Sequence, residues 1–260
     1  MRLVGRLFGL ISILVLGAVV LVGPAVDADA QQKSEAPLSK AQKNQIESIV
    51  KDYILKNPEI ILEAIQTLRQ REQAAARARA EGGIASAKLH LERDPTSPVA
   101  GNPKGDVVIV EFFDYRCEFC KRVFPSVLKL LKQDQNIRYV FKEFPILTPD
   151  SETAARAALV AWKYEKDKYL AFHTVLMKSH GALPVKRVLR MAKKIGLDID
   201  RIKREMGSNE ISGILKRNNE LARQVGVRGT PGFIIAGRLI AGAIDLKTLK
   251  KLVAAARGKT

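Results

Sequence analysis

The sequence predicts an α/β fold in which a long helical block interrupts a small β-sheet. Two apolar runs rich in β-branched and aromatic residues, 106–113 and 137–144, predict strands, and shorter runs follow at 233–235 and 239–241. Between these pairs, residues 151–224 show only helical periodicity. The only two cysteines lie three residues apart, just after the first strand and at the start of a predicted helix.

Residues 1–30 carry the pattern of a secretory signal peptide. Arg2 and Arg6 precede an apolar stretch over residues 7–22, and Ala28-Asp29-Ala30 offers a small-x-small cleavage site. An uncleaved membrane anchor is the alternative, although the stretch is short for a bilayer span. We therefore expect export of the chain and cleavage after Ala30.

Residues 31–92 are expected to form a helical extension. One helix is predicted over residues 39–55 and a second from residue 57 onward, because apolar residues recur at helical spacing in both. These residues are Ile46, Ile49, Val50 and Tyr53, then Ile61, Ile65 and Leu68. So narrow a stripe needs a partner surface, either in the chain's own core or in the same segment of another subunit. We favour the second, which makes residues 39–80 a homo-oligomerisation segment, and we expect a Pro-rich linker at 93–105.

Residues 106–260 form the predicted catalytic domain. A helix over 117–133 separates the first two strands, a helical insertion spans 148–224, and Gly237-Arg238 turns between the last two strands. Asp245 is expected to cap a final helix over 246–255. This order of elements is that of a thioredoxin fold split by a helical insertion: strand, helix, strand, helical block, hairpin and helix.

Cys117 and Cys120 are the candidate redox pair. A thiolate at Cys117 would be stabilised by the dipole and the free N–H groups of the helix that it starts. Cys120 lies one turn deeper, which suits the thiol that resolves a mixed disulfide. In the oxidising compartment that an exported chain enters, disulfides persist. A disulfide between Cys117 and Cys120 would close too short a loop to stabilise the fold much. The pair is therefore expected to be catalytic.

Glu118 and Phe119, between the cysteines, are expected to tune the pair. The charge of Glu118 would raise the pKa of Cys117, and Arg116, Lys121 and Arg122 oppose it. A solvent-facing Glu118 of small effect is the alternative.

Glu111 stands in the otherwise apolar first strand. A carboxylate there is costly unless it is paired or titrating, and beside a buried thiol it could relay the proton of Cys120. An edge or outward-facing position is the alternative.

Thr230-Pro231 precedes the strand at 233–235. Proline is excluded from the middle of a sheet. A cis bond at the mouth of the strand would leave backbone groups free to pair with a substrate chain, although most bonds before proline are trans.

These pieces together resemble the DsbA-like thiol-disulfide oxidoreductases, over roughly residues 100–256. The resemblance rests on the segments 111–115, 117–121 and 229–233. It implies a cis Thr230-Pro231 bond that faces Cys117 and a buried Glu111 near Cys120. It also implies a periplasmic protein whose partners are unfolded or misoxidised clients and a membrane redox partner. The segment 53–59, Tyr-Ile-Leu-Lys-Asn-Pro-Glu, resembles the N-terminal extension of the ScsC-like branch, which is associated with oligomers and with disulfide shuffling or copper tolerance.

One departure from that family bears on the direction of the reaction. Its members often carry Pro-His or Pro-Tyr between the cysteines, where this chain has Glu118-Phe119. An acid there raises the cost of the thiolate and should make the disulfide less oxidising. The sequence thus favours an isomerase or reductase over a strong oxidase.

Other functions are less well supported. The net charge of +17 indicates a basic surface, but the chain has no nucleic-acid motif. An envelope copper protein is the main alternative, since reduced thiolates suit Cu(I). The pair supplies only two ligands, and His173 lies in an apolar helical stretch that predicts a packed core residue. We therefore predict no metal centre and no cofactor.

Overall fold

The computed structural model describes residues 37–258, so the predicted signal peptide lies outside the described residues. The chain divides into two units, residues 1–60 and 61–260. The first contains α1 (Lys40–Lys56). Ser39 caps α1, because its hydroxyl accepts from the N–H of Gln42 while its own N–H donates to the Gln42 side chain.

The apolar stripe of α1 is uncovered within this unit. No residue of α1 is buried. Ile46, Ile49, Val50 and Tyr53, which share one face of the helix, are all exposed. A single amphipathic helix of this kind has no core of its own to hold it.

The second unit begins in the first turn of α2 (Glu59–Ser86), a continuous helix followed by α3 (Lys88–Glu92). A Cβ atom added at Gly83 would lie 2.2 Å from the carbonyl oxygen of Gln224, so glycine permits the close approach of α2 to the end of α9 (Asn209–Gln224). Ile84, Ala87 and Leu91 are buried against the sheet. The last residues of the predicted extension therefore pack in the core of this domain.

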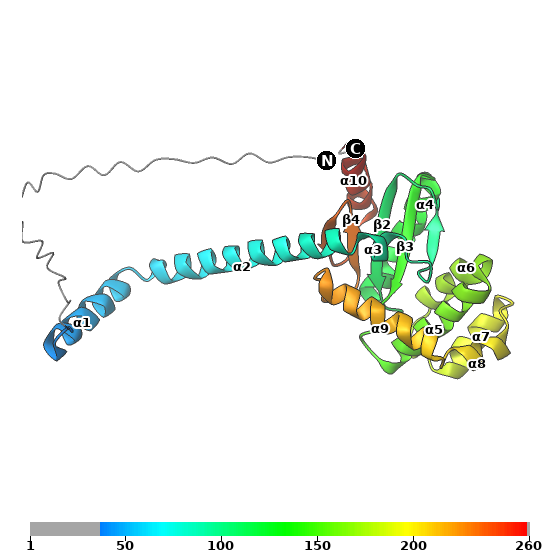
Figure 1. Cartoon of the computed structure of the whole chain (residues 1–260), viewed down its shortest axis with the longest axis horizontal. Coiled ribbons are helices and arrows are strands. Elements are labelled where there is room, and N and C mark those ends of the chain that lie inside the picture. Colours follow the sequence, from blue (N-terminus) through cyan, green and yellow to red (C-terminus); the bar gives the residue numbers. More distant parts are fainter. Residues whose placement is uncertain (1–36, 259–260) are drawn as a thin grey trace, which may run out of the picture. The chain divides into compact units, whose positions relative to one another are not determined.

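Within residues 37–258 the sheet has five strands in the order β1-β3-β2-β4-β5. They are β1 (Val99–Gly101), β2 (Val107–Phe113), β3 (Ile137–Glu143), β4 (Gly232–Ile235) and β5 (Arg238–Ala241). β2 and β3 pair in parallel, and the other pairs are antiparallel. Helices join β2 to β3 and β3 to β4, as the sequence predicted (Figure 1).

The predicted linker at 93–105 is wrong, because β1 forms inside it and pairs with β3. Three prolines suggested a spacer, yet proline is tolerated beside a short edge strand. The segment is also fixed by charge: the buried ammonium of Lys142 lies 3.0 Å from a carboxylate oxygen of Asp94 and donates to the carbonyl of His90. Burial alone would raise the pKa of Asp94, but the charge of Lys142 and the hydrogen bonds that Thr96 donates lower it to about 2.

The two faces of the sheet bury different layers. Ile109 and Phe113 of β2 pack in the larger core, with α4 (Glu118–Gln133), α10 (Leu246–Arg257) and the helical insertion. Val110 and Phe112 point to the opposite face, against α2, α3 and α9. The insertion continues through α5 (Pro149–Tyr164), α6 (Lys166–Met177), α7 (Val185–Lys194), α8 (Ile199–Glu205) and α9. Glu111 lies on the same face of β2 as Ile109 and Phe113. The alternation of the strand therefore turns its side chain toward the core that also contains Cys117 and Cys120.

Candidate active site

Cys117 is the N-cap residue of α4. Its Sγ accepts from the backbone N–H of Cys120 at 3.3 Å, the position that a capping oxygen usually fills. On its other side the thiol donates to the carbonyl oxygen of Thr230 at 3.2 Å. Cys117 is 4% exposed, so little of its side chain meets solvent.

This setting favours the thiolate of Cys117. A hydrogen bond from the Cys120 side chain contributes most, and further hydrogen bonds from the Thr230 side chain and from the N–H groups of Cys120 and Phe119 outweigh the cost of burial. Together they lower the pKa of Cys117 to about 6. The sulfur is therefore a thiolate at neutral pH, as a nucleophile requires.

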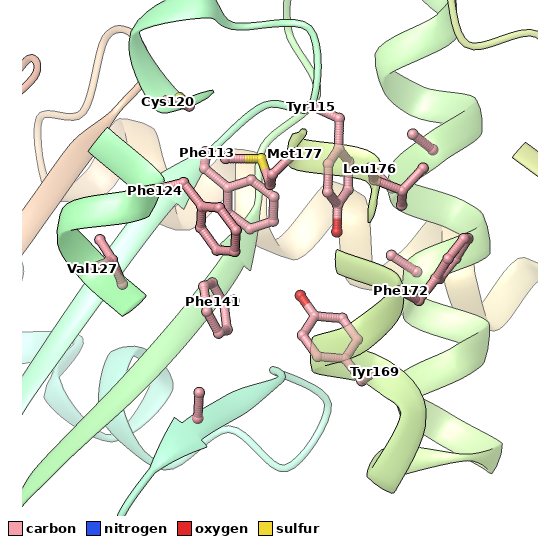
Figure 2. Close-up of a cluster of buried hydrophobic side chains, with 14 of the residues drawn as sticks. Phe113, Tyr115, Cys120, Phe124, Val127, Phe141, Tyr169, Phe172, Leu176 and Met177 are labelled. Atoms are coloured by element: carbon pink, nitrogen blue, oxygen red, sulfur yellow. The ribbon is translucent and has the colours of Figure 1, made fainter. Parts of the chain in front are cut away.

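Cys120 has the opposite character. Its side chain is fully buried, at the edge of an aromatic cluster that includes Phe113 and Phe124 (Figure 2). Burial, then the hydrogen bond with Cys117 and the charge of Glu111, raise its pKa well above that of an ordinary cysteine. Both cysteines are free thiols here, so this is the dithiol state. Cys120 can attack only after a neighbouring group has taken its proton.

Glu111 is the buried acid of this site. It is 2% exposed and lies opposite Phe141 on β3 and Phe233 on β4. The hydroxyl of Tyr139 donates to its Oε2 at 2.6 Å. Burial raises the pKa of Glu111 to about 8 and the charge of Cys117 adds to this, while the Tyr139 hydrogen bond opposes both. The outward-facing alternative is therefore wrong.

Thr230 and Pro231 lie across from the cysteines, directly before β4. The peptide bond between them is cis, as the family resemblance implies. The carbonyl of Pro231 accepts from Gly242. Among the described residues, the N–H of Thr230 has no partner, so a backbone donor remains available beside the Cys117 sulfur.

The dipeptide between the cysteines points outward. The side chain of Glu118 is 62% exposed and lies 3.6 Å from the ammonium of Lys121. Phe119 is 54% exposed, and the guanidinium of Arg122 lies 5.0 Å from the centre of its ring. Because water screens an exposed charge well, the geometry favours the solvent-facing alternative for Glu118.

Two basic residues that flank the cysteines are engaged elsewhere, which the sequence did not reveal. Arg116 donates to the carbonyl of Gly181, and Lys121 donates to that of Ser179 at 2.5 Å. Both carbonyls belong to the loop between α6 and α7. These side chains fasten the active-site loop to the helical insertion rather than simply opposing the charge of Glu118.

A buried polar cluster under the site was also not predicted from the sequence. The hydroxyl of Tyr115 donates to Glu143 at 3.0 Å and lies 2.8 Å from Nδ1 of His173. Tyr115 and Tyr169 turn their hydroxyls toward the same space (Figure 2). Burial lowers the pKa of His173 to about 3 and raises that of Glu143 well above its usual range. The prediction that His173 is a packed core residue is confirmed.

Among the described residues, no three His, Cys, Asp or Glu side chains gather in a way that could hold a metal ion. In the same part of the chain, no helix is both long and apolar enough to cross a bilayer.

Comparison with protein families gives two matches. The family described as Thioredoxin matches residues 93–255, and the one described as Copper resistance protein ScsC N-terminal domain matches residues 42–75.

Three solved structures illustrate the likeness. BcfH of Salmonella enterica Typhimurium is 28% identical, with a TM-score of 0.72 over 83% of this chain and 96% of that one. A linker-deletion mutant of Proteus mirabilis ScsC is 28% identical, with a TM-score of 0.67 over 87% and 100%. The thiol-disulfide exchange protein alpha-DsbA2 of Wolbachia pipientis is 32% identical, with a TM-score of 0.65 over 70% and 97%.

Curated relatives are more distant or much longer. The "Probable disulfide bond formation protein D" of Bacillus anthracis is 24% identical over 169 residues, which are 61% of this chain and 77% of that protein. The Na(+)/H(+) antiporter NhaA 3 of Salinispora tropica is 29% identical over 195 residues, 73% of this chain but only 29% of the antiporter. The chain thus spans less than a third of the length of such antiporters.

The predicted fold class is confirmed: a thioredoxin fold with a helical insertion, preceded by N-terminal helices. By the two family matches and these structures, the chain belongs to the DsbA-like thioredoxin family, in its ScsC-like branch.

Proposed function

We propose that the protein is an exported, periplasmic thiol-disulfide oxidoreductase that acts on unfolded or misoxidised client proteins and leans toward isomerisation or reduction. One observation carries this proposal. A thiolate-prone Cys117 stands at the start of α4 beside the Thr230 carbonyl, with the buried thiol of Cys120 one turn below.

The reaction follows from these two environments. The Cys117 thiolate attacks one sulfur of a client disulfide, whose S–S bond breaks, and the second client sulfur leaves as a thiolate. Cys120 then gives its proton to Glu111 and attacks the Cys117 sulfur. The Cys117–Cys120 disulfide forms, the client is released with both sulfurs reduced, and the protein has lost two electrons. Attack on the mixed disulfide by another client thiol instead gives isomerisation.

Client binding is assigned to the segment across from Cys117. The free N–H of Thr230 can pair with the backbone of an extended client strand, with Pro231 beside it. Phe119, more than half exposed, offers an apolar surface next to the sulfur. A membrane redox partner would return the pair to its working redox state after each net reduction or oxidation.

The isomerase or reductase lean is supported by the Cys117 thiolate. A pKa of about 6 lies between that of thioredoxin, roughly 7, and that of DsbA, roughly 3.5. We therefore expect a reduction potential of roughly −200 mV for the Cys117–Cys120 pair. This lies between the values for thioredoxin, roughly −270 mV, and DsbA, roughly −120 mV. Equilibration with glutathione buffers measures it, and recovery of activity by a scrambled multi-disulfide protein measures isomerisation. A potential at the DsbA value without isomerase activity would mean an oxidase.

Glu118→Gln tests the tuning role in the same assay. The charge of Glu118 is exposed, and an exposed charge interaction of about 0.5 kcal/mol amounts to a shift of only about 10 mV. A shift toward more oxidising potentials several times larger would show that Glu118 sets the direction of the reaction.

We also propose a homo-oligomer formed through residues 39–80, since α1 leaves its apolar stripe exposed. Ile49→Ser with Tyr53→Ser is expected to give monomers by light scattering and to lower isomerase activity, because linked sites raise effective concentration. The reduction potential should stay unchanged. Asn44→Ser with Lys51→Ser, on the opposite face of α1, is the matched control. Monomers in the unmodified protein, or oligomers that survive the first pair, contradict the proposal.

Copper binding is the second candidate, favoured by the family match at residues 42–75. The two thiols supply soft ligands for Cu(I). Titration with Cu(I) separates the candidates: tight binding lost in Cys117→Ser, without turnover of disulfides, would favour copper handling.

A further inference from the structure

A large pocket opens between the second half of α2, the end of α9 and β5. Its volume is about 1050 Å³, enough for several side chains of a bound polypeptide. The C-terminal end of α2 approaches α9 and β4 at this place (Figure 1). The side chain of Gln224 donates to the hydroxyl of Ser86, which holds the two helices together.

The rim of the pocket is strongly basic. Five exposed arginines line it: Arg77, Arg79, Arg223, Arg228 and Arg238. Glu81 is the one acidic residue in the lining. Within residues 37–258, none of the five guanidinium groups makes a hydrogen bond or an ion pair. Guanidinium groups gathered without partners favour carboxylates, with which they can form paired hydrogen bonds.

The floor of the pocket is apolar. Phe144 and Val227 are almost fully buried beneath it, and Leu239 is partly buried. A small inorganic anion would use the rim alone. A ligand that satisfies both parts carries carboxylates together with apolar side chains, as an acidic polypeptide segment does.

One wall of the pocket is formed by residues that directly precede the proposed client-binding segment in the chain. Val227 and Arg228 come shortly before Thr230 in the chain. A Cβ atom added at Gly232, the first residue of β4, would lie 2.9 Å from Cγ1 of Val227, so the pocket wall packs directly on that strand. One wall of the pocket is therefore in contact with the strand that follows Thr230 and Pro231.

We infer that this arginine-rimmed pocket is a second docking site for client polypeptides, which binds their acidic, apolar-containing segments and directs such clients to Cys117. The inference rests on the proposed thiol-disulfide exchange. The net charge of +17 would by itself attract acidic chains, so the test has to separate this pocket from the overall charge.

The experiment compares two synthetic peptides that contain the same disulfide loop. One carries alternating Glu and Leu beyond the loop and the other alternating Lys and Leu. Single-turnover reduction by the reduced protein is followed by chromatography. We expect the acidic peptide to react about tenfold faster at about 20 mM salt, and this preference to fall at about 500 mM salt.

Arg223→Gln with Arg238→Gln is expected to reduce the preference to about twofold. Arg77→Gln with Arg79→Gln, on the exposed side of α2, should act in the same direction and provides a second variant should the first not fold. The matched control is Arg190→Gln with Arg204→Gln, which removes the same charge from α7 and α8 and should keep the preference. Equal rates for the two peptides, or an equal loss in the control, would overturn the inference. Reduction of hydroxyethyl disulfide by the unmodified protein distinguishes this outcome from failure of the proposed function, in which that reduction is absent too.

Discussion

Cys117→Ser is expected to reduce disulfide exchange to the uncatalysed background, a loss of at least about 1000-fold at pH 7. The remaining thiol cannot replace it. Cys120 is fully buried, and its pKa is raised well above the ordinary value, whereas that of Cys117 is lowered to about 6. Each pKa unit above the working pH removes a further tenfold of thiolate. Reduction of insulin, followed by turbidity, measures the loss.

Cys120→Ser is the matched variant, and it should fail in a different way. Cys117 can still attack, so one equivalent of client is captured as a mixed disulfide that persists for lack of a resolving thiol. Non-reducing electrophoresis and mass spectrometry detect that adduct. A trapped adduct in Cys117→Ser and none in Cys120→Ser would reverse the assignment of nucleophile and resolving thiol.

The structure places Cys117 and Cys120 where the sequence predicted, at the start of a helix that follows a strand, because this placement depends only on local sequence. Cys117 and Cys120 lie within one helical turn, and the strand before them and the apolar face of α4 are visible in the sequence. A helix N-terminus places the first cysteine against free N–H groups whatever the rest of the chain does. The alternation of β2 left one question open, namely which face of the sheet meets the larger core.

The parts that the sequence missed depend on long-range contacts. β1 is too short to show a period of two, and it exists because β3 offers an unpaired edge. The family resemblance implied that Glu111 is buried, but the strand pattern alone left this open, because it depends on which face of β2 meets α4 and the insertion. Its hydrogen-bond partner Tyr139, 28 residues away, was not predicted. The arginine pocket combines residues from α2, α9 and β5 that no sequence spacing brings together.

Glu111→Gln is expected to slow the resolving step by about 100-fold while leaving the first attack by Cys117 nearly unchanged. Cys120 has to lose its proton in a buried site, and a carboxylate with a pKa of about 8 is a suitable acceptor near neutral pH. Quenched-flow measurement of mixed-disulfide decay isolates the step. Tyr139→Phe keeps the carboxylate but removes the hydrogen bond that favours its charge, so its decay profile should shift to higher pH. Unchanged decay in Glu111→Gln would exclude Glu111 as the base.

The same variant should make the reduced protein more stable, with a definite dependence on pH. The pKa of Glu111 is raised from 4.5 to about 8 by folding, so between these values the folded state binds more protons and stability falls as pH rises. The cost is absent below about pH 4.5, reaches about 3 kcal/mol at pH 7 and levels off above about pH 8. Glutamine carries no such cost and can still accept from Tyr139. The lowered pKa of Cys117 contributes to the pH dependence of stability with the opposite sign. That contribution is present in both proteins, so it largely cancels when the variant and the unmodified protein are compared. Urea unfolding at pH 5, 7 and 8.5 should therefore show a stability difference that grows with pH, and a constant difference would mean that Glu111 does not titrate in the fold.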